Sequence, residues 1–209
     1  VDILVLGSSI SHRATKVLYD ILKDYSELRT MRLFAQSACR PLESNCKDYF
    51  AAAENLIKAS HPDITITIYD DSEKLRAPIE NITNDSALQA FERYLTLLSE
   101  NSKFVVLDEF YPLPSTSVGI AVSMYKRLLR NQSLTDLKGQ YQSFLDSYDN
   151  YFKRLDAIHI ENLRRHNTSG PLCAEQPGWC WWYNRHNLHA YFTDNVHLSM
   201  DGLMLERDS

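Results

Sequence analysis

The residue types best suited to covalent chemistry lie near the two ends of the 209-residue chain. Ser9 follows an apolar run that ends in Gly7, and Asp194 precedes His197 by three positions. A serine hydroxyl becomes a good nucleophile when a histidine takes its proton, and a carboxylate can orient that histidine. These residues predict that Ser9 is a nucleophile, with His197 as the general base and Asp194 as its partner.

The position of Ser9 suits this role. The apolar run over residues 2–7 predicts a buried strand, and apolar residues at helical spacing predict a helix over 9–24. Backbone N–H groups at the start of a helix stabilise negative charge on oxygen. Two simpler interpretations stay open. Ser8 or Ser9 caps this helix and does nothing else, and Asp194 caps the final helix beside a surface His197.

Strand-like and helix-like segments alternate along most of the chain. Sequence patterns predict strands over 2–7, 29–35, 63–69, 104–107 and 188–192, and helices over 9–24, 46–60, 86–99, 118–130 and 134–165. The alternation predicts a three-layer α/β/α fold of the flavodoxin-like type, with an open, mostly parallel sheet. Ligands bind beyond the carboxyl ends of the strands in such sheets. We find no linker within residues 1–209 and expect a single domain.

The charge and hydropathy of the chain exclude one class of partner. The formal net charge is -5, and no run of Lys and Arg forms a stripe that could follow a nucleic-acid backbone. We therefore expect no nucleic-acid partner.

No stretch reaches the roughly 20 apolar residues that span a bilayer. Because Val1 already begins a strand-like run, we expect the sequence to be part of a longer, membrane-anchored polypeptide.

Four cysteines occur as two like-spaced pairs, Cys39 with Cys46 and Cys173 with Cys180. An even count at such spacing indicates disulfides, for which four cysteines allow three connectivities. We predict pairing within each local pair. The alternative is a zinc site formed by the second pair with His186 and His189, but its spacing does not match the common zinc-binding patterns. We expect no metal.

Sequons for N-linked glycosylation are frequent in the sequence. They begin at four asparagines, Asn81, Asn84, Asn131 and Asn167. N-glycosylation and disulfide formation both belong to the secretory pathway. The sequence therefore predicts a glycoprotein on the extracellular or lumenal side of a membrane.

The two terminal motifs together resemble those of the SGNH, or GDSL-like, hydrolases. That family has a Gly-Asp-Ser block after its first strand and an Asp-x-x-His block before its last helix. The sequence is more similar still to the SGNH domain that follows the membrane part of acyltransferase family 3 proteins. Segments typical of that domain occur at Ser37–Pro41, Pro62-Asp63, Leu172-Cys173 and Asp194–Gly202.

This resemblance implies an SGNH hydrolase fold and assigns a role to each terminal residue. Ser9 would be the nucleophile, His197 the general base and then acid, and Asp194 the residue that orients the imidazole. The implied function is a serine-dependent O-acyl esterase or O-acyltransferase that acts through an acyl-serine on an acylated carbohydrate or other hydroxyl acceptor. It needs no cofactor. The implied partners are an acylated small molecule or glycan and a covalently linked membrane acyltransferase domain.

The sequence departs from the family pattern at the oxyanion hole. Ser9 N–H would be one donor, and Ser8 replaces the Asp of the first block. The glycine and asparagine donors have no counterparts, and Ser37 and the Asp70-Asp71 pair occupy their approximate places. An ionised carboxylate cannot donate a hydrogen bond, so Asp70 could serve only through its backbone N–H or if protonated. These departures favour an alternative function, a catalytically impaired SGNH-fold domain that binds a ligand or protein partner.

Two further segments have a structural and a functional interpretation. Trp179, Trp181 and Trp182 form either part of the core or a platform on which a sugar stacks. Asp108 and Glu109 follow the strand predicted over 104–107, where substrate contacts are expected, although charged residues are common at strand ends.

Overall fold

The computed structural model describes residues 1–69, 72–174 and 177–205. The chain divides into two units, which are described in turn. Unit 1 comprises Val1–Glu109 and Ser147–His166, and unit 2 comprises Phe110–Asp146 and Asn167–Ser209. Helix α6 (Tyr141–Asp156) belongs to both units, because it begins in unit 2 and ends in unit 1.

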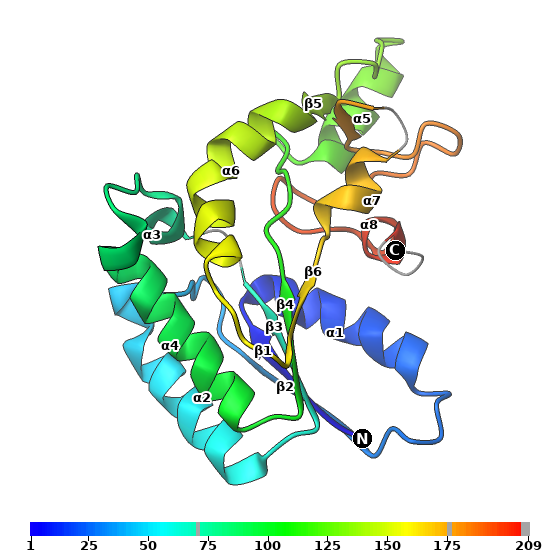
Figure 1. The fold of residues 1–209 in the computed structure, drawn as a ribbon. Coiled ribbons are helices and arrows are strands. Elements are labelled where there is room, and N and C mark those ends of the chain that lie inside the picture. Colours follow the sequence, from blue (N-terminus) through cyan, green and yellow to red (C-terminus); the bar gives the residue numbers. More distant parts are fainter. Residues whose placement is uncertain (70–71, 175–176, 206–209) are drawn as a thin grey trace. The chain divides into compact units, whose positions relative to one another are not determined.

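A parallel sheet of five strands forms the centre of unit 1 (Figure 1). Its strands, in spatial order, are β2 (Thr30–Ala35), β1 (Asp2–Gly7), β3 (Ile64–Ile68), β4 (Phe104–Asp108) and β6 (Leu163–His166). Each neighbouring pair is parallel. Residues 3–7 of the interior strand β1 are buried, which is why its sequence is a continuous apolar run. The predicted α/β fold with a parallel sheet is confirmed.

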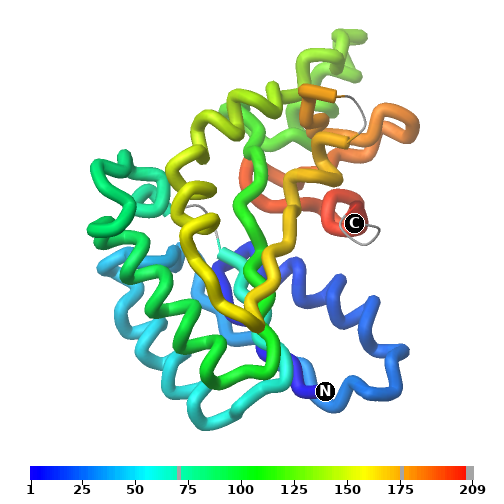
Figure 2. Tube along the Cα trace, viewed as in Figure 1, coloured from blue at the N-terminus to red at the C-terminus, as the bar shows by residue number. Residues whose placement is uncertain are grey.

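Helices cover both faces of this sheet. Helix α1 (Ser9–Leu22) packs on one face, and α2 (Lys47–Ser60) and α4 (Ser86–Glu100) lie side by side on the other (Figures 1 and 2). The face of α4 that its spacing predicted is buried, namely Leu88, Phe91, Leu95 and Leu98. Short elements complete the unit: η1 (Ser44–Cys46), α3 (Glu73–Arg76) and η2 (Ile82–Asn84).

The predicted fifth strand was misplaced. The strand expected over 188–192 is absent, since Phe192 and Ala190 form only isolated bridges, with Leu198 and Tyr183. The fifth strand is instead β6, which begins within the segment predicted as a helix over 134–165 and ends one residue after it. It reads Leu-Arg-Arg-His and lies at the edge of the sheet. An edge strand needs little apolar surface because solvent reaches it, so its sequence lacks the usual apolar signal.

Unit 2 contains a small sheet and an aromatic core. Strands β5 (Lys138–Gln140) and β7 (Trp179–Trp181) pair antiparallel, and the helices are α5 (Ile120–Leu129), α7 (Ser169–Cys173) and α8 (Met200–Leu205). Trp181 and Trp182 are buried, and the Trp182 ring meets Phe192 edge-on at 5.6 Å between centroids. These two tryptophans are therefore core residues and not a sugar platform. The half-buried Trp179 ring is covered by the Lys138 ammonium at 3.8 Å.

Both predicted disulfides are present. Cys39 is bonded to Cys46 in the segment that follows β2, and Cys173 to Cys180 between α7 and β7. The second bond rules out the zinc alternative, because neither sulfur is available as a thiolate. All four sequon asparagines are exposed. Of the helices in the described part of the chain, none is both long enough and apolar enough to cross a membrane.

A buried ion pair joins α6 to the start of α4. Arg154 is 1% exposed, and its guanidinium donates from Nε and Nη2 to the Asp85 carboxylate at 2.9 and 2.7 Å. Its Nη1 donates to the carbonyls of Leu75 and Ala77, both at 2.8 Å. The Arg154 hydrogen bonds outweigh burial and hold the pKa of Asp85 below its ordinary value. Asp85 also caps α4 by accepting from the Leu88 N–H at 2.6 Å.

Replacing Arg154 with methionine should lower the free energy of unfolding by about 3–5 kcal/mol, because Asp85 would keep a buried charge without a partner. Urea denaturation at pH 7 measures this loss. Arg127→Met is the matched control, since Asp136, the partner of Arg127, is 66% exposed and such pairs contribute about 0–1 kcal/mol. Because the pKa of Asp85 is lower in the folded protein than its ordinary value of 3.8, this carboxylate stabilises the fold at any pH above 3.8. That stabilisation is lost as the pH falls through the pKa of the folded state. The gap between wild type and Arg154→Met should therefore narrow below pH 3.8, and a constant gap would contradict the ion-pair explanation.

Candidate active site

The turn between β1 and α1 places Ser9 at the first residue of a helix. Ser8 is the N-cap, is fully buried, and donates its backbone N–H to the Ile68 carbonyl at 3.1 Å. Ser11 Oγ donates to the Ser8 carbonyl at 2.7 Å. A Cβ atom on Gly7 would lie 2.0 Å from the Ile68 carbonyl oxygen, so this close approach of β1 to β3 requires glycine. Ser8 thus has the capping role, and the half-buried Ser9 has the position of a candidate nucleophile.

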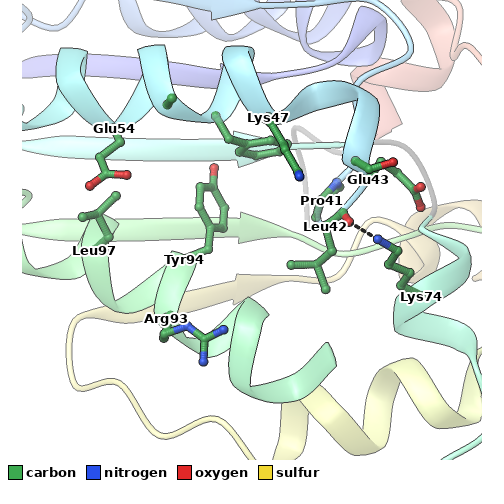
Figure 3. A pocket seen from close by; sticks show the side chains of 12 residues that line it. Pro41, Leu42, Glu43, Lys47, Glu54, Lys74, Arg93, Tyr94 and Leu97 are labelled. Carbon is green, nitrogen blue, oxygen red and sulfur yellow. Dashed lines mark hydrogen bonds between the residues drawn. The ribbon is translucent and has the colours of Figure 1, made fainter. Parts of the chain in front are cut away.

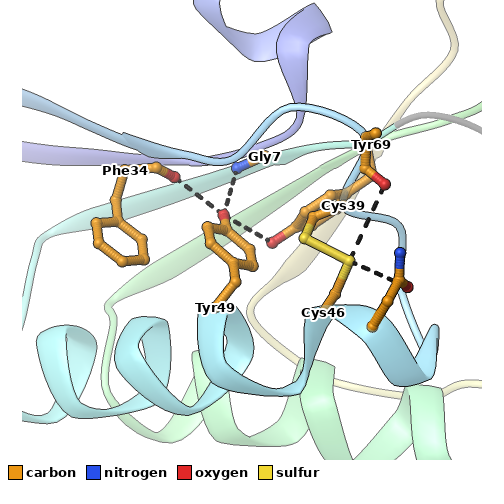
Figure 4. The surroundings of a disulfide bond; sticks show 8 residues. Gly7, Phe34, Cys39, Cys46, Tyr49 and Tyr69 are labelled. Atoms are coloured by element: carbon orange, nitrogen blue, oxygen red, sulfur yellow. Dashed lines mark hydrogen bonds between the residues drawn. A yellow bond between two sulfur atoms is a disulfide. The ribbon is translucent and has the colours of Figure 1, made fainter.

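A chain of tyrosine hydroxyls holds the end of β1 (Figure 4). The Gly7 N–H donates to Tyr49 Oη at 3.0 Å, and Tyr49 Oη donates to the Phe34 carbonyl at 3.0 Å. Tyr69 Oη lies 3.4 Å from Tyr49 Oη and 2.9 Å from Tyr94 Oη. Because a carbonyl only accepts, the one Tyr49 proton goes to Phe34, so Tyr69 donates to Tyr49 and Tyr94 donates to Tyr69. Burial raises the pKa of Tyr69 well above its ordinary value, which keeps the chain neutral.

Replacing Tyr49 with phenylalanine should lower the free energy of unfolding by about 1–3 kcal/mol, because the Gly7 N–H and the Phe34 carbonyl both lose a buried partner. Urea denaturation followed by circular dichroism measures the change. Tyr19→Phe is the matched control, since Tyr19 is 50% exposed. Equal effects of the two substitutions would show that the hydroxyl chain does not stabilise the end of β1.

In unit 2, Asp194 and His197 lie together in one short loop. Asp194 Oδ1 accepts the backbone N–H groups of Val196 and His197 at 2.8 and 2.7 Å, and Oδ2 lies 2.8 Å from His197 Nδ1. The loop is closed by the Thr193 N–H, which donates to the His197 carbonyl at 3.0 Å. The final helix α8 is capped by Ser199, whose Oγ accepts the Gly202 N–H at 3.1 Å. Asp194 is therefore engaged by His197 and its loop, and another residue performs the capping role.

The hydrogen bonds of Asp194 determine the charge of this carboxyl group and the tautomer of His197. Burial alone would raise the pKa of Asp194, but the backbone N–H groups of His197 and Val196, together with the imidazole, hold it below the ordinary value. Asp194 is thus a carboxylate at neutral pH, and it accepts from Nδ1–H of His197. The lone pair that can take a proton is then on Nε2. This is the tautomer that a general base needs.

Two of the three predicted oxyanion donors, Ser9 and Ser37, lie in the described part of the chain. Ser37 is exposed in the turn after β2, where the Cys39 N–H donates to the Gln36 carbonyl at 3.2 Å. The Gln36 N–H donates to the Gly7 carbonyl at 3.1 Å, so the segments that carry Ser37 and Ser9 leave the same edge of the sheet. Ser9 N–H belongs to the first turn of α1, whose N–H groups are not used within the helix. Asp70 lies outside the described residues.

Unit 1 also has a pocket of about 760 Å³ between α2 and α4 (Figure 3). Its walls include apolar side chains such as Phe50 and Leu97 and the cations Lys47, Lys74 and Arg93. Neither Ser9 nor Ser37 lines it. This pocket is therefore a separate feature from the turn that carries the candidate nucleophile.

A parallel sheet with a serine at the first strand-to-helix turn has the α/β architecture of the SGNH hydrolases. Residues 1–208 match the family described as the SGNH domain fused to AT3 domains. The chain belongs to this family, as the resemblance of its motifs indicated. Membership supports an acyl-esterase or acyltransferase activity and a linked acyltransferase domain. The two disulfides are consistent with an extracytoplasmic domain.

Several solved structures share this fold at low sequence identity. The lipopolysaccharide acetyltransferase periplasmic domain of Salmonella ser. Paratyphi A has a TM-score of 0.70 at 14% identity, over 99% of this chain and 80% of that chain. A catalytic mutant of an acetylxylan esterase from Geobacillus stearothermophilus gives 0.57 at 13%, over 97% and 89%. A putative acylhydrolase from Bacteroides fragilis gives 0.55 at 11%, over 99% and 82%. No curated protein sequence matches the chain.

Proposed function

We propose that this chain is a serine-dependent O-acyl esterase or O-acyltransferase with Ser9, His197 and Asp194 as its catalytic residues. The observation that carries the proposal is the Asp194 carboxylate, which accepts from both the backbone and Nδ1 of His197 at 2.7–2.8 Å. This arrangement prepares Nε2 to take a proton from a serine. The family match over residues 1–208 supports Ser9 as that serine.

In the proposed reaction, Ser9 Oγ attacks the carbonyl carbon of an ester while its proton passes to His197 Nε2. The negative charge moves to the carbonyl oxygen, for which Ser9 N–H is one donor. The ester C–O bond then breaks, the departing alkoxide takes the proton from Nε2, and an acyl-serine remains. A second hydroxyl, or water, gives its proton to Nε2 and attacks the acyl carbon. Ser9 regains the proton as the new ester, or the acid, leaves.

The proposed substrate is an acylated carbohydrate or another acylated hydroxyl compound. Two proteins with the same fold are described as a lipopolysaccharide acetyltransferase and an acetylxylan esterase, which supports a carbohydrate. The proposed acyl source is a membrane acyltransferase domain in the same polypeptide, as the family description indicates. We further propose that residues 1–209 act as one domain on the extracellular or lumenal side of a membrane. Exposure of the four sequon asparagines supports glycosylation there.

A second candidate function is a binding domain that keeps the fold without turnover. The sequence around the oxyanion hole favours it, because Ser37 and the Asp70-Asp71 pair occupy the approximate places of the family's glycine and asparagine donors. For catalysis we propose that the backbone N–H groups of Ser37 and Asp70 act beside Ser9 N–H. A peptide N–H can replace a side-chain donor at such a position.

Labelling with a fluorophosphonate probe tests the proposed function directly. The probe phosphorylates an activated serine, so the wild-type chain should be labelled and the label should map to Ser9 by peptide mass spectrometry. Ser9→Ala should lose the label. Labelling of Ser9→Ala at the wild-type rate would overturn Ser9 as nucleophile, and an unlabelled wild-type chain would favour the binding domain.

A further inference from the structure

A second histidine–carboxylate pair lies at the carboxyl edge of the sheet in unit 1. Asp108 ends β4 and His166 ends β6, and the two residues are partners in the parallel ladder. His166 Nδ1 lies 2.8 Å from Asp108 Oδ1, with side-chain exposures of 35% and 12%. The Glu109 N–H donates to the His166 carbonyl at 3.0 Å, which keeps the two strand ends together. The proposed reaction does not use this pair.

The pair leaves one ring nitrogen of His166 available. Asp108 accepts from Nδ1–H, so in the neutral ring Nε2 carries the lone pair. Across the described residues, His166 has no other side-chain hydrogen bond or ion pair than the one to Asp108. The hydrogen bond to Asp108 raises the pKa of His166 although burial opposes it. Nε2 can therefore accept a hydrogen bond when the ring is neutral, or donate one when it is protonated.

The charges around His166 disfavour an anionic ligand. Asp108 and Glu109 both add negative potential at the ring. The nearby cation, Arg165, is already paired with Glu109 and with Asp156. An approaching phosphate or carboxylate would meet the carboxylates of Asp108 and Glu109, while Arg165 is already neutralised by its own partners. A neutral hydroxyl group, which can accept and donate, suits this environment better.

The register of the sheet places the pair level with the Ser9 turn. Gly7 is the ladder partner of Ile68, Thr67 is that of Leu107, and Asp108 follows Leu107 at the next position. Gly7 and the Asp108–His166 pair thus end their strands at the same height. From β1 to β6 there are three strand spacings, which amount to about 14 Å. One sugar ring does not bridge that length, but a short oligosaccharide does.

We propose that His166 and Asp108 form a distal subsite that binds a hydroxyl group of an extended, neutral polyhydroxylated substrate whose ester lies at Ser9. The inference rests on the proposed function and adds a substrate class, an oligosaccharide of at least two sugar units. His166 Nε2 makes the hydrogen bond and Asp108 is the positioning residue that orients the ring. The sequence pattern indicated substrate contacts for Asp108 but not for His166, because the two residues meet only when β4 and β6 pair.

Kinetics on acetyl esters of increasing length test the subsite. The probes are 4-nitrophenyl acetate and xylose, xylobiose, xylotriose and xylotetraose that each carry one acetyl group on the terminal sugar. For wild type, kcat/KM should rise once the chain exceeds one sugar. For His166→Ala, the loss should be roughly three- to tenfold larger on the xylotetraose ester than on 4-nitrophenyl acetate. His166→Gln, which keeps a polar group near the Nε2 position, should recover part of the preference for length.

His159→Ala is the matched control, because His159 is an exposed histidine in the same unit, and it should keep the wild-type dependence on length. An equal loss for His166→Ala on every ester, or a wild-type enzyme with no preference for length, would overturn the subsite.

A binding measurement separates this inference from the proposed function. In the Ser9→Ala variant, the His166 ring resonances should shift when unacetylated xylotetraose is added and should stay unchanged with xylose. A shift with inorganic phosphate and none with xylotetraose would overturn the hydroxyl assignment. If Ser9→Ala kept full turnover, the proposed nucleophile would be wrong, while the ring resonances would still decide whether the subsite exists.

Discussion

Replacing Ser9 with alanine is expected to lower kcat for hydrolysis of 4-nitrophenyl acetate by about 10⁴-fold or more. Without Oγ no acyl-serine forms, and what remains is the contribution of the backbone donors and of substrate binding. Initial rates with saturating ester measure the effect. Such a loss would exceed that of any other single substitution outside the proposed catalytic residues.

Ser8→Ala is the matched control for Ser9→Ala. It removes the neighbouring hydroxyl, but Ser8 is the fully buried N-cap of α1. We therefore expect a loss of about 1 kcal/mol in the free energy of unfolding and a small change in kcat. A Ser9→Ala variant that keeps more than a tenth of the wild-type rate would contradict the proposed mechanism, as would a Ser8→Ala variant that is folded and inactive.

Substitutions of the Asp194–His197 pair should have the second largest effect. His197→Ala removes the base and should lower kcat to about the level of Ser9→Ala, because the two groups act as a unit. Asp194→Asn keeps the shape but can donate to Nδ1, which favours the tautomer with its proton on Nε2. We expect a loss of about 10⁴-fold. The double variant Ser9→Ala with His197→Ala should be no slower than either single variant.

His189 and Asp201 provide a control of the same chemistry in the same unit. Their side chains lie 3.0 Å apart and are 58% and 48% exposed. This pair also joins a histidine Nδ1 to an aspartate, but it lies outside the Asp-x-x-His motif. His189→Ala should keep kcat within about twofold of wild type, since surface substitutions seldom change the free energy by more than about 0.5 kcal/mol. A large loss of rate in His189→Ala would show that the wrong histidine has been assigned.

Local sequence signals predicted the parts of the fold and site that depend on neighbouring residues. β1 and the start of α1 follow from an apolar run, a glycine and helical spacing within about twenty positions. Asp194 and His197 are three positions apart, so one turn is enough to bring them together. The disulfides likewise join cysteines that are close in sequence, with a separation of 7 in each bond.

Features that depend on distant pairing were not predicted. The hydroxyl chain forms only after β1, β2, β3 and α2 have packed, because these elements bring together Tyr49, Tyr69 and the Phe34 carbonyl. Helical spacing alone indicates no more than that Tyr49 is a core residue. β6 is defined by its ladder with β4, while its own sequence has one apolar residue followed by three polar ones. The local pattern of Leu163–His166 therefore did not indicate a strand, and the helix was predicted to run on to residue 165. The segment is a strand because it pairs with β4 at the edge of the sheet.

The order in which the chain builds its two units limits how the protein can be divided. Unit 1 is completed by Ser147–His166, which follows the first segment of unit 2 along the sequence. A fragment that stops at Glu109 would keep Ser9 but lack β6, so β4 would become an unprotected edge and Asp108 would lose His166. Neither unit is one uninterrupted stretch of the sequence, so no single deletion removes one unit and leaves the other complete. Gene truncation is therefore a poor route to an inactive but folded protein, and point substitutions are the appropriate tool.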